Sequence, residues 1–184
     1  ETGRESSGAP GFYLGRDARS AQGCSIMIPF ELDGDLMFID SNPGERLLHI
    51  LRNRYSKFSA KEGCLSGSCG SCTVLMNGSP LPSCMIPVFQ IRGASIITLE
   101  YFKTMVDYRD IEEGFASAKV EMCGYCDAGK ILHAHALLEK TLRPTSEEIR
   151  ECFAGNACRC TSIEDLIAGV KTAAVLRRKR KNAQ

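Results

Sequence analysis

Four cysteines in the first half of the chain have the spacing needed to hold iron and sulfide. Cys64, Cys69 and Cys72 follow a Cys-x4-Cys-x2-Cys pattern, and Cys84 lies a short distance beyond them. This is the plant-type ligand pattern of a [2Fe–2S] cluster. Glycines within the loop allow its backbone to bend around an inorganic core. The alternatives are a disulfide with two free thiols and a zinc site, although zinc favours paired Cys-x2-Cys knuckles.

A second group of four cysteines lies in the C-terminal half. Cys123 and Cys126 have two residues between them, and Cys158 and Cys160 have one. Each pair comes directly before a predicted helix, where the helix dipole and free N–H groups stabilise a thiolate. Taken alone, this pattern suits zinc as well as iron. Beside a plant-type loop in the same chain, a second iron–sulfur cluster is the better interpretation.

The remaining candidate ligands carry weaker signals. Cys24 and Cys152 lie outside both groups. Cys152 is interpreted as a packed thiol, and no function follows for Cys24. His133 and His135 are two positions apart on a predicted helix, so they face different directions and make a poor metal pair. His49 is interpreted as a packed or surface side chain.

Composition narrows the classes of partner. The chain has 184 residues, 43% of them hydrophobic, and a net charge of +1. This allows one domain or two small ones and argues against nucleic acid as the main partner. No apolar run is long enough to span a membrane, and no signal segment is visible. A cytoplasmic location is therefore expected, with a processed periplasmic form as the alternative, since the first residue is Glu1.

The elements of the N-terminal half predict a β-grasp outline. Asp33-Gly34 between two apolar stretches is a strong hairpin signal, and apolar residues at helical spacing follow it. Residues 1–23 are interpreted as an extended arm. The predicted elements are strands over 25–32, 35–40, 73–76 and 95–99, with a helix over 45–54 and a turn at Asn77-Gly78.

The C-terminal half predicts a small helical bundle. Thr145 with Glu148 and Thr161 with Glu164 have the spacing of capping boxes. The basic run over 177–181 is interpreted as a solvated helix end that favours cations, with a targeting or docking patch as the alternative. The predicted helices are 111–122, 129–141, 148–154 and 165–176.

Together these segments resemble the iron–sulfur subunit, or domain, of the molybdenum hydroxylases. That family includes xanthine dehydrogenase, aldehyde oxidoreductase and the small chain of carbon monoxide dehydrogenase. The resemblance covers about residues 26–175, and both cysteine groups match in order. The matching stretches are 61–75, 83–84, 123–126, 144–150 and 155–161.

The resemblance implies an α+β fold with two cluster-binding parts. A β-grasp, ferredoxin-like [2Fe–2S] domain over 24–100 would precede an all-α four-helix [2Fe–2S]-binding domain over 101–176. The run of basic residues separately predicts a basic tail over 177–184, outside the resemblance. Cys64, Cys69, Cys72 and Cys84 would hold a cluster nearer a flavin. The ligands of a cluster nearer a molybdopterin would be Cys123, Cys126, Cys158 and Cys160.

The resemblance also implies a role within a hetero-oligomer. Substrate would be hydroxylated at molybdopterin on a large partner chain, and electrons would cross both clusters to FAD on a medium partner chain. This chain would then be a non-catalytic electron-transfer subunit with no catalytic residues. The sequence does not specify the substrate.

Two departures from the family pattern lie beside the second cysteine group. The family usually has a glutamine that contacts the pterin where this chain has Met122, whose thioether cannot donate hydrogen bonds. The family also tends to place Thr-Pro-Gly after the second cysteine, where this chain has Asp127-Ala128-Gly129, with Asp127 as a candidate N-cap. Met122 motivates a second hypothesis, a two-cluster electron carrier whose molybdopterin site is altered or absent. A zinc-stabilised interaction module is the third.

Overall fold

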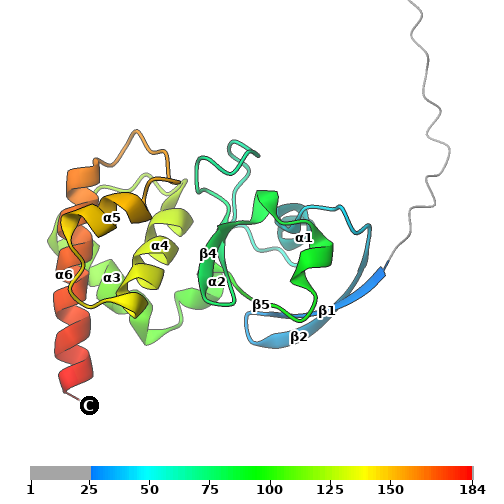
Figure 1. Ribbon diagram of the computed structural model, residues 1–184, viewed down its shortest axis with the longest axis horizontal. Coiled ribbons are helices and arrows are strands. Elements are labelled where there is room, and N and C mark those ends of the chain that lie inside the picture. The colour runs from blue at the N-terminus through cyan, green and yellow to red at the C-terminus, as the bar shows by residue number, and fades with distance from the viewer. Residues whose placement is uncertain (1–25, 184) are drawn as a thin grey trace, which may run out of the picture.

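The computed structural model describes residues 26–183, which form a half built around a sheet and a half built from helices (Figure 1). The predicted arm over 1–23 and Cys24 lie outside the described residues. Within residues 26–183 the chain is mixed α/β, with one five-stranded sheet and six α-helices. None of these helices is long and apolar enough to cross a membrane.

The predicted hairpin is confirmed. Strands β1 (Ile26–Leu32) and β2 (Asp35–Ser41) pair antiparallel around Asp33 and Gly34. Those two residues have φ of 55° and 91°, as both central residues of a type I′ turn require. The alternation of apolar residues along β1 places Ile28 against the core, which fixes the register of the pair.

The other strands complete a sheet with the order β2-β1-β5-β3-β4. The predicted strand β3 (Thr73–Met76) is confirmed, and β5 (Ser95–Ile97) is shorter than predicted. Strand β4 (Ser79–Pro82) was not predicted, because its two prolines argue against a strand; the edge position of β4 allows them. Helix α1 (Leu47–Asn53) is confirmed, and its buried leucine and isoleucine side chains share one core with β1.

The helical half contains α2 (Leu99–Phe102), α3 (Val106–Ser117), α4 (Asp127–Lys140), α5 (Ser146–Cys152) and α6 (Ile163–Asn182). The predicted helix over 111–122 was wrong at both ends. Its start carries no side-chain cap that the sequence could reveal, and Lys119 has a φ of 55° that a right-handed helix cannot accommodate. The predicted strand end over 98–99 was also wrong, because α2 begins there.

One of the two predicted helix caps is confirmed. Thr145 and Glu148 form the reciprocal hydrogen bonds of a capping box at α5. The second cap was misplaced by one residue, since Ser162 Oγ accepts the N–H of Asp165 at 3.0 Å. Thr161 is unavailable because its hydroxyl donates to the carbonyl of Glu121.

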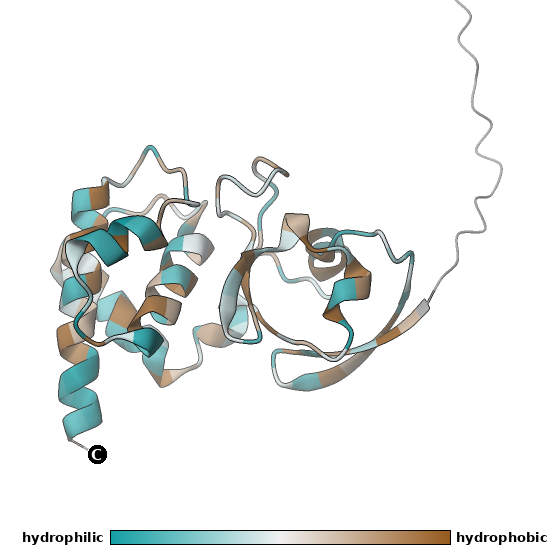
Figure 2. Ribbon diagram, in the orientation of Figure 1, coloured by the Kyte–Doolittle hydropathy of each residue, from teal (hydrophilic) through white to brown (hydrophobic). Residues whose placement is uncertain are grey.

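The basic run is not a tail outside the fold. Helix α6 continues to Asn182, and its last turns are hydrophilic in Figure 2. The interpretation of this run as a solvated helix end was wrong for Arg177, which has no exposed surface. Its guanidinium pairs with Asp110 at 3.3 Å and with Glu139 at 3.0 Å, so it ties α6 to α3 and α4.

Candidate metal centres

The loop before β3 carries Cys64, Cys69 and Cys72, and the short 3-10 helix η1 (Ser83–Met85) places Cys84 beside Cys72. We call these four cysteines the first site. The four thiols differ in solvent exposure: Cys64 is exposed, Cys69 is half-buried, and Cys72 and Cys84 are buried. The loop bends through Gly70 at a φ of 69°, which favours glycine. All four are free thiols, so the predicted disulfide alternative does not hold in this structure.

Backbone and hydroxyl groups of the loop stabilise a thiolate at its exposed end. The N–H groups of Ser66 and Ser68 lie 3.4 and 3.3 Å from Cys64 Sγ. Hydrogen bonds from these two serines lower the pKa of Cys64 to about 5. Because the thiolate is the form that binds metal, Cys64 is prepared as a ligand at neutral pH.

The two buried cysteines of the first site would become thiolates more easily if a cation were bound beside them. Burial raises the pKa of Cys72 to about 11, and Cys84 lies within hydrogen-bonding reach of it. Two adjacent buried thiols lose their protons readily only when a cation neutralises them. The loop is also closely packed around Cys69, because a Cβ on Gly63 would lie 2.8 Å from Cys69 Sγ. Only glycine fits at position 63 without a shift of its neighbours. Donor chemistry and space therefore fit an iron–sulfur cluster.

The second site, which we define as Cys123, Cys126, Cys158 and Cys160, lies where α4 and α6 begin. Cys126 is the N-cap of α4, and Cys160 comes two residues before the N-cap of α6. Asp127, the predicted N-cap, is instead the first residue of α4. The structure thus brings together all four cysteines from two segments that are distant in sequence.

The thiols of the second site divide into two neighbouring pairs. Cys123 lies beside Cys160 and Cys126 beside Cys158, close enough for the members of each pair to affect one another's pKa. Burial raises the pKa of Cys126 to about 11. Burial acts the same way on Cys158, but the N–H groups of Thr161 and Cys160 outweigh it and lower that pKa to about 7. This donor set would also fit a group that binds four thiolates.

The two sites lie on loops that touch one another. The N–H of Ala157 donates to the carbonyl of Ser68 at 3.3 Å, which joins the second loop to the first. Asn156 packs against Gly70 and Gly129, and both polar atoms of its side chain lack partners among residues 26–183. Sequence reasoning did not identify Asn156 as a functional candidate, although its position two residues before Cys158 was a signal.

A second link runs along the outer edge of the loops. Lys61 donates from Nζ to the carbonyl of Gly124 and lies 5.5 Å from the ring centre of Tyr125. The hydroxyl of Tyr125 donates to the carbonyl of Glu62 at 2.6 Å. Residues flanking the first site are therefore bonded directly to residues inside the Cys123–Cys126 segment.

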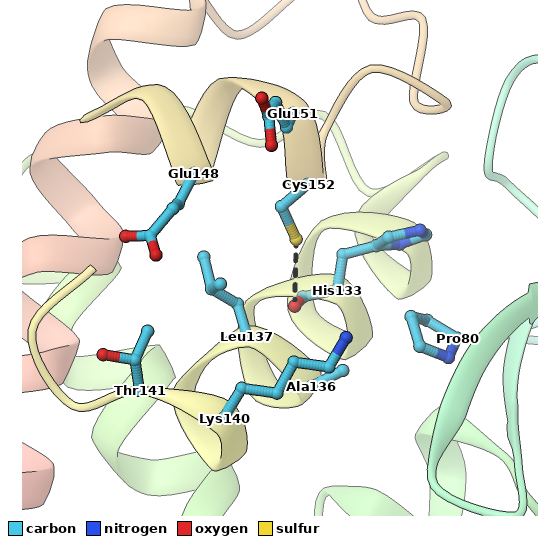
Figure 3. A pocket seen from close by; sticks show the side chains of 9 residues that line it. All are labelled: Pro80, His133, Ala136, Leu137, Lys140, Thr141, Glu148, Glu151 and Cys152. Atoms are coloured by element: carbon cyan, nitrogen blue, oxygen red, sulfur yellow. Dashed lines mark hydrogen bonds between the residues drawn. The ribbon is translucent and has the colours of Figure 1, made fainter. Parts of the chain in front are cut away.

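The other candidate residues lie apart from both sites. Cys152 is half-buried and donates to the carbonyl of His133 at 3.3 Å, beside a cavity of about 580 Å³ (Figure 3). Burial raises the pKa of Cys152 to about 11, so it is protonated and unreactive at neutral pH. His49 is half-exposed on α1, 4.0 Å from Glu62.

A carboxylate and histidine group elsewhere is already occupied by a side chain. Asp107, His135 and Glu139 come close enough to hold a cation. The guanidinium of Arg177 fills that position, bonded to Glu139 and to the carbonyl of Asp107. This group is therefore a structural ion-pair network.

Two protein-family models match the chain. One is described as a 2Fe-2S iron-sulfur cluster binding domain and matches residues 39–112. The other is described as a [2Fe-2S] binding domain and matches residues 98–171. The first range contains the whole first site, and the second range contains the whole second site.

Individual proteins show the same relationship. The nicotinate dehydrogenase small FeS subunit of Eubacterium barkeri is 40% identical over 148 residues, which cover 80% of this chain and 94% of the relative. The nicotine 6-hydroxylase small subunit of Paenarthrobacter nicotinovorans is 34% identical, with coverage of 79% and 87%. The crystal structure of quinoline 2-oxidoreductase from Pseudomonas putida 86 matches with a TM-score of 0.76 and 31% identity, covering 85% of this chain and 97% of the matched chain.

Fold, cysteine geometry and similarity together define an iron–sulfur protein of the oxidoreductase class. More particularly, the chain belongs to the family of small iron–sulfur subunits of molybdenum hydroxylases. The predicted family resemblance is thereby confirmed. Membership makes the chain a component of a multi-subunit oxidoreductase and supports a role in electron transfer.

Proposed function

We propose that this chain carries electrons through two [2Fe–2S] clusters in a xanthine dehydrogenase-like molybdenum hydroxylase. The ligands of one cluster are the four cysteines of the first site, and those of the other are the four cysteines of the second site. Electrons enter from a molybdopterin on a large partner chain and leave to FAD on a medium partner chain. The chain itself supplies no catalytic residue.

We also propose that the chain is divided into two cluster-binding domains. A ferredoxin-like β-grasp domain over 24–100 holds the first cluster, and a four-helix domain over 101–176 holds the second. The single observation that carries the proposal is the direct contact between the two cysteine loops, through Ala157 and Ser68. Two groups held by touching loops are close enough to exchange electrons without a further carrier.

The chain's own residues have three tasks in this function. Cysteine thiolates bind the irons, which supply the one-electron chemistry once bound. N–H groups such as those of Ser66 and Ser68 stabilise the negative charge on sulfur. Packing between the loops excludes water and fixes the separation of the two groups.

Met122 supports a second candidate function. It is half-buried against the helical core and borders two grooves beside the second site. A thioether there cannot donate a hydrogen bond to a pterin. An electron carrier in a related complex with an altered or absent molybdopterin site is therefore the alternative proposal.

Metal analysis and spectroscopy of the purified chain test the cluster assignment. We expect about four irons and as many sulfides per chain, with two distinct reduced EPR signals. Colourless protein that contains stoichiometric zinc would contradict both redox functions and support the interaction module.

Purification of the intact complex separates the two redox candidates. Recovery of a large chain that contains molybdopterin, together with a flavin-containing chain, is expected for the molybdenum hydroxylase. A two-cluster chain that is recovered with no molybdopterin would favour the alternative carrier.

A further inference from the structure

Lys130 is a lysine with no exposed surface, in the first turn of α4. Its Nζ donates to Thr161 Oγ1 at 2.8 Å. No carboxylate within residues 26–183 forms an ion pair with it. A buried ammonium without an anionic partner is costly, so its counter-charge must be sought among other groups nearby.

The groups that meet this need are the cysteines of the second site, which are negatively charged once they bind metal as thiolates. Lys130 lies on α4, which begins directly after Cys126, and the hydroxyl that accepts from its Nζ belongs to the residue after Cys160.

Lys130 contacts both of the segments that carry the cysteines of the second site. Lys130 follows the ligand Cys126 by one helical turn, and its N–H donates to the carbonyl of Cys126 at 3.4 Å. Its partner Thr161 directly follows Cys160. The side chain therefore joins the two segments that carry the second site, from the buried side.

We propose that Lys130 is the buried counter-charge of the second site and raises the reduction potential of the [2Fe–2S] cluster held there. This deepens the proposed function and rests on it. A cluster with four thiolate ligands is negative, and reduction adds one further negative charge. A fixed cation nearby therefore stabilises the reduced form more than the oxidised form, and net charge near a cluster is one of the determinants of its potential.

Lys130 could instead serve only to position Thr161 through its hydrogen bond. Two substitutions separate the charge from the hydrogen bond. Lys130→Gln removes the charge and keeps a donor, whereas Lys130→Met removes both and keeps an unbranched side chain. Lys140→Met is the matched control, because Lys140 is exposed at the far end of the same helix.

The experiment is a redox titration with dithionite on the purified complex, followed through the two EPR signals. We expect both Lys130 variants to shift the second cluster to a lower potential. At one fixed solution potential, the ratio of reduced to oxidised second cluster should fall by about tenfold or more, because one nearby positive charge is lost. The first cluster should titrate as in the parent protein, and Lys140→Met should change neither cluster.

Three results would overturn the inference. They are an unchanged second-cluster potential in both variants, an equal shift of both clusters, and a parental potential in Lys130→Gln with a shift in Lys130→Met alone. The last would show that the hydrogen bond matters and the charge does not. Absence of the second EPR signal from the parent protein would instead contradict the proposed function.

Loading is a second readout. If neither neutral variant retains the second cluster, Lys130→Arg decides the outcome. Retention of the cluster with arginine would support the requirement for charge. Its loss in all three variants, with iron retained at the first site, would show that lysine is needed for its shape, against the proposal.

Discussion

Gly129 and Asn156 lie in contact at the junction of the two cysteine loops. A Cβ at position 129 would collide with the Asn156 side chain and would lie 2.5 Å from the carbonyl oxygen of Gly70. Glycine is therefore required here for close approach of two backbones. The separation between the two sites depends on this contact.

Gly129→Ala should weaken the contact between the sheet half and the helical half. The clash involves the Gly70 backbone, which cannot rotate away, so overpacking should cost about 1–3 kcal/mol of unfolding free energy. Denaturant unfolding measures this, and Gly155→Ala is the control, since nothing lies within 4 Å of a Cβ there. Equal stability of the two variants would contradict the contact.

Cys69→Ser should remove or perturb the first cluster alone. The second site has its own four thiols on the segments that lead into α4 and α6, and none of them comes from the loop over 63–72. We expect iron to fall by about half, with the second EPR signal retained. Cys152→Ser is the control, because that thiol lies outside both sites and should leave both signals intact. Loss of both signals from a folded Cys69→Ser protein would contradict the assignment of two sites.

Thiols of the metal-free chain should differ in their pH dependence of alkylation. The lowered pKa of Cys64, about 5, makes it a thiolate above that pH, whereas Cys126 and Cys152 stay protonated up to about pH 11. At pH 7, iodoacetamide should therefore label Cys64 well before the other two. Peptide mapping by mass spectrometry measures the labelling of each cysteine. Uniform labelling of Cys64 and Cys126 at pH 7 would contradict the environments described for both.

The same shift has a consequence for folding. A thiol whose folded pKa is depressed contributes stability that is present above its unfolded pKa and is lost as pH falls through the folded value. For Cys64 in the metal-free protein, that stability should fall progressively from about pH 9, its ordinary pKa, and should be lost by about pH 5.

Arg177→Met should destabilise the helical half. Arg177 is fully buried, and its removal leaves Glu139 without its 3.0 Å partner and takes one cation from the buried carboxylate of Asp110, which keeps Arg180. Breaking such a buried pair costs about 3–5 kcal/mol. Thermal unfolding measures the loss, and Lys179→Met, on an exposed position of the same helix, is the control. A similar stability for both variants would show that the network contributes little.

Local features and the kind of chemistry follow from the sequence alone. Cysteine spacing indicated two four-thiol groups, because ligand spacing is a local property of the chain. Asp33-Gly34 predicted the hairpin, and Thr145 with Glu148 predicted the α5 cap, since both depend on neighbouring residues alone. Strand β4 was missed because prolines are tolerated at an edge position that no local signal reveals.

Which residues act across segments depends on how the chain packs. In the sequence, Lys130 and Arg177 are ordinary cations on helices; only packing buries them, beside the second site and between α3 and α4. The contact between Asn156 and Gly70 joins residues 86 positions apart. Local spacing can name the ligands of each site, but the distance between the sites and the charge around them depend on how the two halves pack.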